Sequence, residues 1–147
     1  MAYSAEADVL LLIPSSSVAQ LTDDTAGTTT DGAKVTRAIA QADAFINSYL
    51  RGRYTVPITG TAPDEIRDCS AWLAIANLFE RRPSALSEGI PPTVKEKRDL
   101  YIKWLESCRD GKIVLSIDGG DANEESFIVT DKDDDDLVFT DDVLDQM

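Results

Sequence analysis

Apolar side chains recur at three- and four-residue spacing along three long stretches of the chain, and each stretch predicts an amphipathic helix. The second stretch has the widest apolar face, which is typical of a helix that contacts neighbours on more than one side. Two shorter helical segments precede the three long ones. The predicted helices cover residues 5–13, residues 15–21, residues 33–51, the segment from Thr61–Asp64 to about Arg82, and residues 93–111.

Polar residues and a glycine mark the expected ends of these helices. Ser4 is a predicted N-cap for the first helix, and Thr61 and Thr93 open sequences that resemble capping boxes. Gly52 is a predicted C-terminal stop. Residues 22–32 contain no large apolar side chain, so an exposed loop is expected between the second and third helices.

Beyond Gly111 the apolar period changes from helical to alternating. Ile113, Leu115 and Ile117 are expected on one side of an extended segment, and residues 126–130 are its predicted partner strand. Because a lone hairpin is marginally stable in water, this hairpin needs a helix, another subunit or a partner to pack against.

The sequence therefore predicts a mainly α fold in two parts. Residues 1–111 are a small helical bundle of three long and two short helices, and residues 112–147 are a C-terminal arm that forms a β-hairpin or an extended acidic tail. The formal net charge of −13 divides into −2 for residues 1–117 and −11 for residues 118–147. A nearly neutral body thus carries a polyanionic arm, and neither part has the basic surplus that gripping DNA phosphates requires.

The residues that most enzymes need are missing. The chain has no histidine, which removes the usual general base and the commonest zinc ligand, and it has no glycine-rich phosphate loop. Neither an enzyme nor a cofactor is expected. Cys69 and Cys108 lie on the apolar sides of predicted helices and are expected to be buried and reduced. The longest apolar run, residues 9–13, is too short to cross a bilayer, so a soluble protein without membrane contact is expected.

One metal-site hypothesis concerns the acidic arm. Asp131, Asp133 and Asp135 occupy positions one, three and five of an EF-hand loop. The pattern then fails, because position six is Asp136 rather than glycine and position twelve is Asp142 rather than glutamate. The sequence leaves two interpretations open. The segment is either a specific calcium site or an acidic tail that attracts cations loosely.

Arginine and tyrosine gather at the ends of two predicted helices. These residue types are favoured at protein interfaces, because they cover apolar area and offer directed hydrogen bonds. The alternative is that the arginines are helix C-terminal cations that face water. The candidate interface residues here are Arg51, Arg53, Tyr54, Arg81 and Arg82.

The end of the arm supplies a second group of candidates. An apolar triplet follows the four aspartates at positions 133–136, which is unusual for a tail that is only solvated. We expect it to contact a partner or a neighbouring subunit. The candidates in this segment are Leu137, Val138, Phe139 and Leu144.

The order of these features resembles the phage Mu-type head-tail connector, or neck, family of tailed phages and Mu-like prophages. The resemblance rests on the long helix that closes on residues 49–54, on Val56 and Pro57, and on the final residues 137–144. It implies a helical bundle that assembles as a ring of twelve copies beneath the portal after DNA packaging. It also implies assembly in the host cytoplasm, a final place in the neck of the virion, and a platform for the next neck protein or the tail terminator. Genomic DNA would pass through the channel without specific binding.

A second interpretation comes from the charge alone. A polyanionic arm can mimic DNA and block a basic partner, which would make the chain a regulatory or inhibitory binding protein. The connector predicts oligomers or assembly on the portal, whereas the DNA mimic predicts a monomer that binds a nucleic-acid enzyme with strong salt dependence.

Overall fold

The computed structural model describes residues 1–82 and 89–117, and within these ranges every regular element is an α-helix. The mainly α fold is confirmed, and the predicted helices agree with the observed ones to within a few residues. The helices are α1 (Glu6–Leu12), α2 (Ser15–Thr22), α3 (Gly32–Leu50), α4 (Asp64–Arg81) and α5 (Pro92–Arg109).

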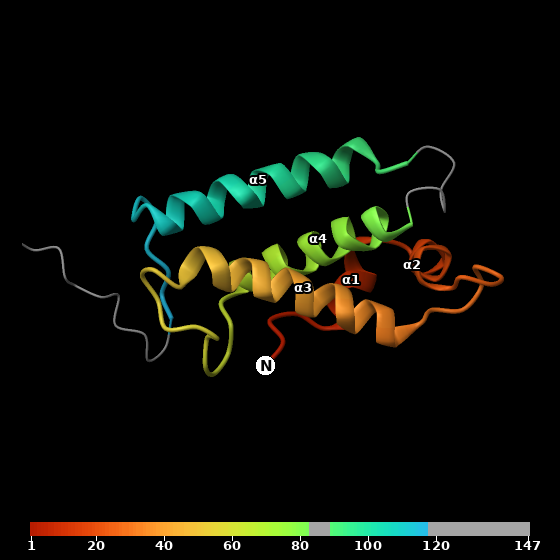
Figure 1. Cartoon of the computed structure of the whole chain (residues 1–147), viewed down its shortest axis with the longest axis horizontal. Coiled ribbons are helices and arrows are strands. Elements are labelled where there is room, and N and C mark those ends of the chain that lie inside the picture. Colours follow the sequence, from red (N-terminus) through yellow and green to blue (C-terminus); the bar gives the residue numbers. More distant parts are fainter. Residues whose placement is uncertain (83–88, 118–147) are drawn as a thin grey trace, which may run out of the picture.

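Helix α4 is the centre of the body and packs against each of the other four helices. Figure 1 shows α3 and α5 running alongside it, with α1 and α2 gathered at its C-terminal half. Ten of its 18 residues are buried, and their side chains point to more than one side of the helix, as the wide apolar stripe predicts. Its largest fully buried side chains are Ile66, Ile75 and Leu78.

The predicted N-caps are wrong at three helices. Helix α4 begins after Pro63 and α5 begins after Pro91, so Thr61 lies before its helix and Thr93 lies inside its own. Proline is compatible with these positions, because the first N–H groups of a helix have no partner within it. Ala5 is the N-cap of α1, since the hydroxyl of Ser4 lies 2.7 Å from the hydroxyl of Ser70 in the interior.

The described start of the C-terminal arm does not support the hairpin prediction. Residues 112–117 form no strand, and the proposed partner, residues 126–130, lies outside the described residues. The alternation itself is present, because Leu115 is buried whereas Val114 is 65% exposed. Ile113 and Ile117 also pack against the hydrophobic core. These apolar side chains cover the helical body, so they need no second strand.

Both cysteine thiols are buried and free, as the sequence predicts. Within residues 1–82 and 89–117, no three His, Cys, Asp or Glu residues lie close enough together to hold a metal ion. The EF-hand-like segment, residues 131–142, lies outside these ranges. Of the helices described, none combines the length and apolar character needed to span a membrane.

Candidate interaction surfaces

The end of α3 carries the first group of candidate residues, and the structure gives its members different positions. Arg51 is exposed, Arg53 is half-buried and Tyr54 is only 5% exposed. The phenolic oxygen of Tyr54 accepts a hydrogen bond of 3.0 Å from the backbone N–H of Leu115. Tyr54 is therefore a core residue that anchors the start of the arm, and its prediction as an exposed interface residue is wrong.

Arg53 lies against the turn that ends α5. Gly111 has a φ angle of +75° at this turn, and a Cβ atom added there would lie 2.7 Å from Cζ of Arg53. The guanidinium thus covers the glycine backbone closely. Arg51 is the member of this group that remains available to a partner.

Arg81 and Arg82 bind the end of α2, although Arg81 stays exposed and Arg82 half-buried. Arg81 donates to the carbonyl of Leu21 at 2.7 Å and to a carboxylate oxygen of Asp24 at 2.8 Å. Arg82 donates to the carbonyl of Gln20 at 3.0 Å. These carbonyls belong to the last turn of a helix, where they lack helical partners and favour a cation. Both arginines therefore have a structural role that the sequence did not reveal.

The arginines do not form one cluster. Asn77 near the end of α4 donates to the carbonyl of Ala38 near the start of α3, so these two helices run in opposite directions. The end of α3 and the end of α4 consequently lie at opposite ends of the body (Figure 1). Grouping Arg51 and Arg53 with Arg81 and Arg82 was wrong for this reason.

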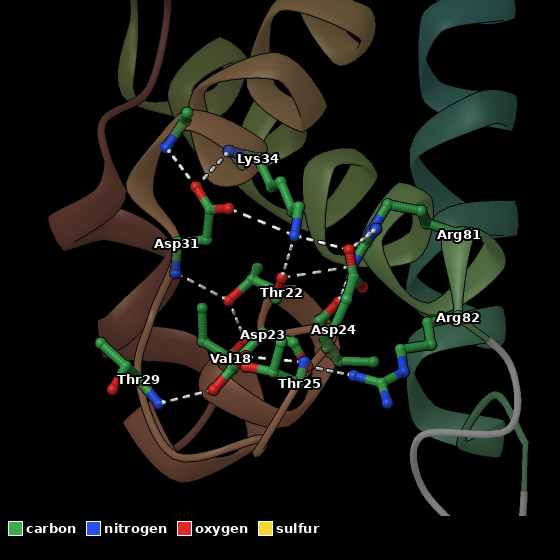
Figure 2. Close-up of polar contacts among 12 residues, drawn as sticks. Val18, Thr22, Asp23, Asp24, Thr25, Thr29, Asp31, Lys34, Arg81 and Arg82 are labelled. Carbon is green, nitrogen blue, oxygen red and sulfur yellow. Dashed lines mark hydrogen bonds and ion pairs between the residues drawn. The ribbon is translucent and has the colours of Figure 1, made fainter.

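The loop between α2 and α3 is ordered by its own carboxylates (Figure 2). Asp23 accepts hydrogen bonds from the backbone and hydroxyl of Thr25 and from the backbone of Thr28 and Thr29. The side-chain hydrogen bond from Thr25 is the largest cause of the lowered pKa of Asp23, followed by the backbone bonds. The loop was expected to be exposed, and it is, but it is also closely hydrogen-bonded.

Two cations from different helices meet on a single carboxylate in this loop. Lys34 of α3 lies 2.6 Å from Asp24, and Arg81 of α4 lies 2.8 Å from it. Hydrogen bonds from Arg81 and then Lys34 are the largest causes of the lowered pKa of Asp24. The same contacts raise the pKa of Lys34, with the bond to Asp24 as the largest cause. Asp24 thus connects the loop to both long helices.

A groove of about 510 Å³ lies beside this contact, between the first half of α3 and the last half of α4. Its floor contains Ala38 and Leu78. Its polar lining has three cations and one anion, and the anion, Glu80, is already paired with Arg98 of α5. The polar residues that line the groove are Lys34, Arg37, Gln41, Asn77, Glu80 and Arg81.

Aromatic and aliphatic side chains are exposed on three helices. The rings of Phe45 and Tyr49 lie 5.0 Å apart on α3, and the guanidinium of Arg109 lies 5.9 Å from the ring of Tyr49. Leu11 on α1 is 84% exposed and Leu100 on α5 is 56% exposed. These residues were not among the predicted candidates.

A buried polar network joins the start of the chain to α3 and α4. Asp43 accepts a hydrogen bond of 3.0 Å from the backbone N–H of Tyr3 and one of 2.6 Å from the hydroxyl of Ser70. The hydroxyl of Tyr3 donates to Asn47 and accepts a bond from the backbone N–H of Ile58 at 2.9 Å. Burial is the largest cause of the raised pKa of Asp43.

Sequence reasoning missed this network, although one signal was available. Asp43 lies four residues after Ile39 and three before Ile46, so it occupies the apolar stripe of α3. A carboxylate at such a position requires hydrogen-bond partners, because an unpaired buried charge is costly. The remaining predicted candidates lie in the arm, outside the described residues: Leu137, Val138, Phe139 and Leu144.

Comparison with known proteins identifies relatives for most of the chain. Residues 3–129 match the family described as "Bacteriophage Mu, Gp36". Over 82 residues, the chain is 34% identical to "Gene product J" of Escherichia phage Mu. This similarity covers 56% of the present chain and 52% of the phage Mu protein, so the chain spans about half the length of the curated relative it matches.

Proposed function

The chain belongs to the Bacteriophage Mu Gp36 family, and from this membership we propose that it is a structural virion protein of the head-tail connector type. In this proposal it assembles as a ring under the portal, completes the head after DNA packaging and provides the platform for tail attachment. The observation that carries the proposal is the family match, which extends from residue 3 through the helical body and into the arm at residue 129.

Features of the described residues support a role completed by neighbours. The body exposes aromatic and aliphatic side chains, including Phe45, Leu11 and Leu100, on three different helices. Such side chains are the usual anchors of protein interfaces. The start of the arm is fixed to the body at Leu115, which leaves the acidic residues after it to reach a partner.

The proposal includes partners and a location. The partners are further copies of the chain in a ring of twelve, the portal, and the next neck or tail-terminator protein. Packaged DNA passes through the ring, and the net charge of −13 disfavours its adhesion to the wall. The protein is made in the host cytoplasm and ends in the virion neck, and its role there is structural rather than enzymatic.

The first test measures mass by light scattering on the purified chain, alone and after mixing with the portal protein from the same genome. The proposal expects a ring, or a monomer that joins the portal. A chain lacking residues 118–147 serves as the second sample, because it retains the five helices that the structure describes. We expect this truncated chain to keep its helical circular dichroism and to lose portal binding.

Two outcomes would contradict the proposal. A monomer that does not bind the portal would contradict the connector function and favour the DNA-mimic interpretation. The net charge of −11 on residues 118–147 supports that interpretation. In that case, binding to a basic nucleic-acid enzyme should weaken steeply with salt. Portal binding at full strength by the truncated chain would contradict the role given to the arm.

A further inference from the structure

We propose that the groove between α3 and α4 receives the aspartate run at residues 133–136 from the arm of a neighbouring copy. This inference rests on the proposed ring, because it identifies the surface through which consecutive copies meet. The groove belongs to one copy and the aspartates to the next, so the contact is head-to-tail. Repetition of a head-to-tail contact generates a ring when its rotation closes.

The charges of the groove favour an acidic peptide. Glu80 is paired with Arg98, so it does not oppose an incoming carboxylate strongly. Lys34 and Arg81 share Asp24, and Lys34 also pairs with Asp31 at 3.2 Å, so the charges of these two cations are largely compensated. Arg37 is an exposed cation of the groove, and among the residues that the structure describes it has no ion-pair partner. It is therefore the residue expected to contribute most.

The shape and the neutral polar groups of the groove agree with this occupant. The groove has a volume of about 510 Å³, which is enough for several side chains of an extended peptide. Gln41 is exposed beside Arg37 and offers an amide N–H to a carboxylate. An arginine and an amide side by side are typical donors for carboxylate oxygens.

Charge repulsion explains why the aspartates should come from a second copy. Copies with a net charge of −13 repel one another, so a ring needs a contact in which opposite charges meet. If the aspartate run docked in the groove of its own chain, the groove would be occupied but no two copies would be joined. The arm also starts near Tyr54, at the end of α3, whereas the groove lies along its first half, some 28 Å of helix away at most.

The chain length makes the contact feasible. Fifteen residues, 118–132, separate the last described residue from the aspartate run. Fully extended, they would span roughly 50 Å. This reach includes a groove on an adjacent body, and it also includes the groove of the same chain. The experiment must therefore distinguish an aspartate run that comes from a neighbouring copy from one that comes from the same chain.

The test uses variants of the full chain that each carry one added cysteine, and it follows disulfide formation between copies. Gln41→Cys places a thiol in the groove, and Leu137→Cys places one directly after the aspartate run without removing an aspartate. The native thiols of Cys69 and Cys108 are buried and do not compete. We expect the mixture of the two variants to give a disulfide-linked dimer that contains one of each. Thr36→Cys, exposed on α3 outside the groove lining, is the matched control for Gln41→Cys.

Charge reversal tests the electrostatic part. Arg37→Glu, combined with Gln41→Cys, should lower the yield of mixed dimer at least about fivefold. Lys103→Glu makes the same change of charge on α5 and should leave the yield within about twofold. Asp134→Lys in the partner copy should restore part of the yield lost by Arg37→Glu. The yield should also fall in about 0.5 M salt, which shortens the range of charge attraction.

Each alternative outcome has a defined meaning. If the double variant Gln41→Cys and Leu137→Cys closes within one chain at high dilution and the mixture gives no dimer, the aspartates dock on their own body and the inference is wrong. Equal yields for Gln41→Cys and Thr36→Cys would also overturn it. If the chain binds the portal but no cross-link forms in the groove, only this inference is contradicted. If the cross-link forms but the chain does not bind the portal, the proposed function is contradicted instead.

Discussion

The phenolic oxygen of Tyr54 accepts a hydrogen bond of 3.0 Å from the backbone N–H of Leu115, which lies 61 residues later in the chain. Both residues are buried, so this bond satisfies a buried backbone donor. It joins the connection after α3 to the segment that follows α5. The bond therefore fixes the point at which the arm leaves the helical body.

Tyr54→Phe should loosen the start of the arm while the helices stay folded. The change leaves the N–H of Leu115 without its acceptor, so we expect a loss of about 1–2 kcal/mol in the free energy of unfolding. Urea denaturation measures this loss, and hydrogen exchange should show faster exchange at Leu115. Tyr101→Phe is the control, because no hydrogen bond of the Tyr101 hydroxyl is present among the described residues. Equal effects of the two substitutions would show that the bond to Leu115 contributes nothing.

Asp43→Ala should lower the free energy of unfolding more than Asp43→Asn does. Alanine leaves the N–H of Tyr3 without an acceptor, at a cost of about 1–3 kcal/mol, and removes one acceptor of the Ser70 hydroxyl, which can still bond to Ser4. Asparagine keeps one carbonyl oxygen for Tyr3. Its amide can donate to Ser70, because the serine hydroxyl can accept as well as donate. Denaturation of the two variants would contradict this reasoning if both were equally unstable.

The pH dependence of these variants follows from the raised pKa of Asp43. Because burial makes the native carboxyl hold its proton more tightly than the unfolded one, its contribution to stability declines as the pH rises above the usual carboxyl range. Asp43→Asn has no such titration. The stability of the wild type relative to Asp43→Asn should therefore fall as the pH rises above about 4. A relative stability that stays constant over this range would contradict the role given to burial.

Asp24→Asn should weaken the attachment of the loop between α2 and α3 to the two long helices. The pKa of Asp24 is lowered by Arg81 and Lys34, so its stabilising effect is complete above the usual carboxyl range and is lost as the pH falls below it. We expect the variant at pH 7 to resemble the wild type in acid, with less protection of the Thr28 and Thr29 amides in both, relative to the intrinsic exchange rate at each pH. Asp99→Asn on α5 is the control. Unchanged exchange in Asp24→Asn would mean that Asp23 alone orders the loop.

The two thiols should be unreactive in the native protein. Burial raises the pKa of Cys69 to about 12 and that of Cys108 to about 11, so little thiolate exists near neutral pH. A thiol-disulfide colour reagent at pH 8 should detect no thiol in the native protein and both in guanidinium chloride. Ala40→Cys, exposed on α3, should add one rapidly reacting thiol. Fast reaction of the native chain would place a cysteine at the surface.

Gly111→Ala should destabilise the end of α5 by about 1 kcal/mol. The φ angle of +75° is unfavourable for alanine, whereas the overlap with Arg53 involves the far end of a flexible side chain that can move away. The backbone should therefore account for most of the loss. The double variant with Arg53→Ala separates the two causes in denaturation experiments. Recovery of most of the stability in that variant would show that the overlap with Arg53 matters more.

Sequence patterns predicted the helices well because each helix is built from local repeats. The stripe of α4 was read correctly as a face in contact on several sides, and its ten buried residues agree. Ser4 shows where local rules failed. Its sequence position favours an N-cap, but its hydroxyl bonds to Ser70, which is 66 residues away. A long-range partner of this kind leaves no trace in local spacing.

The candidate surfaces were predicted less well, since exposure depends on which helices meet. Tyr54 lies in a segment rich in arginine and looked exposed, but its partner Leu115 comes from the other end of the chain. Arg81 and Arg82 looked like free C-terminal cations, but the end of α2 lies against them. The antiparallel pairing of α3 and α4 decides both the separation of the arginines and the position of the groove.

The buried start of the chain has a consequence for folding during synthesis. Tyr3 and Ser4 leave the ribosome before their partners Asp43 and Ser70, which follow 40 and 66 residues later. The polar network cannot close until α4 has been made. Helix α5 adds Leu105 and Cys108 to the same core still later. The helical body is therefore expected to complete its folding only when nearly all of it has emerged.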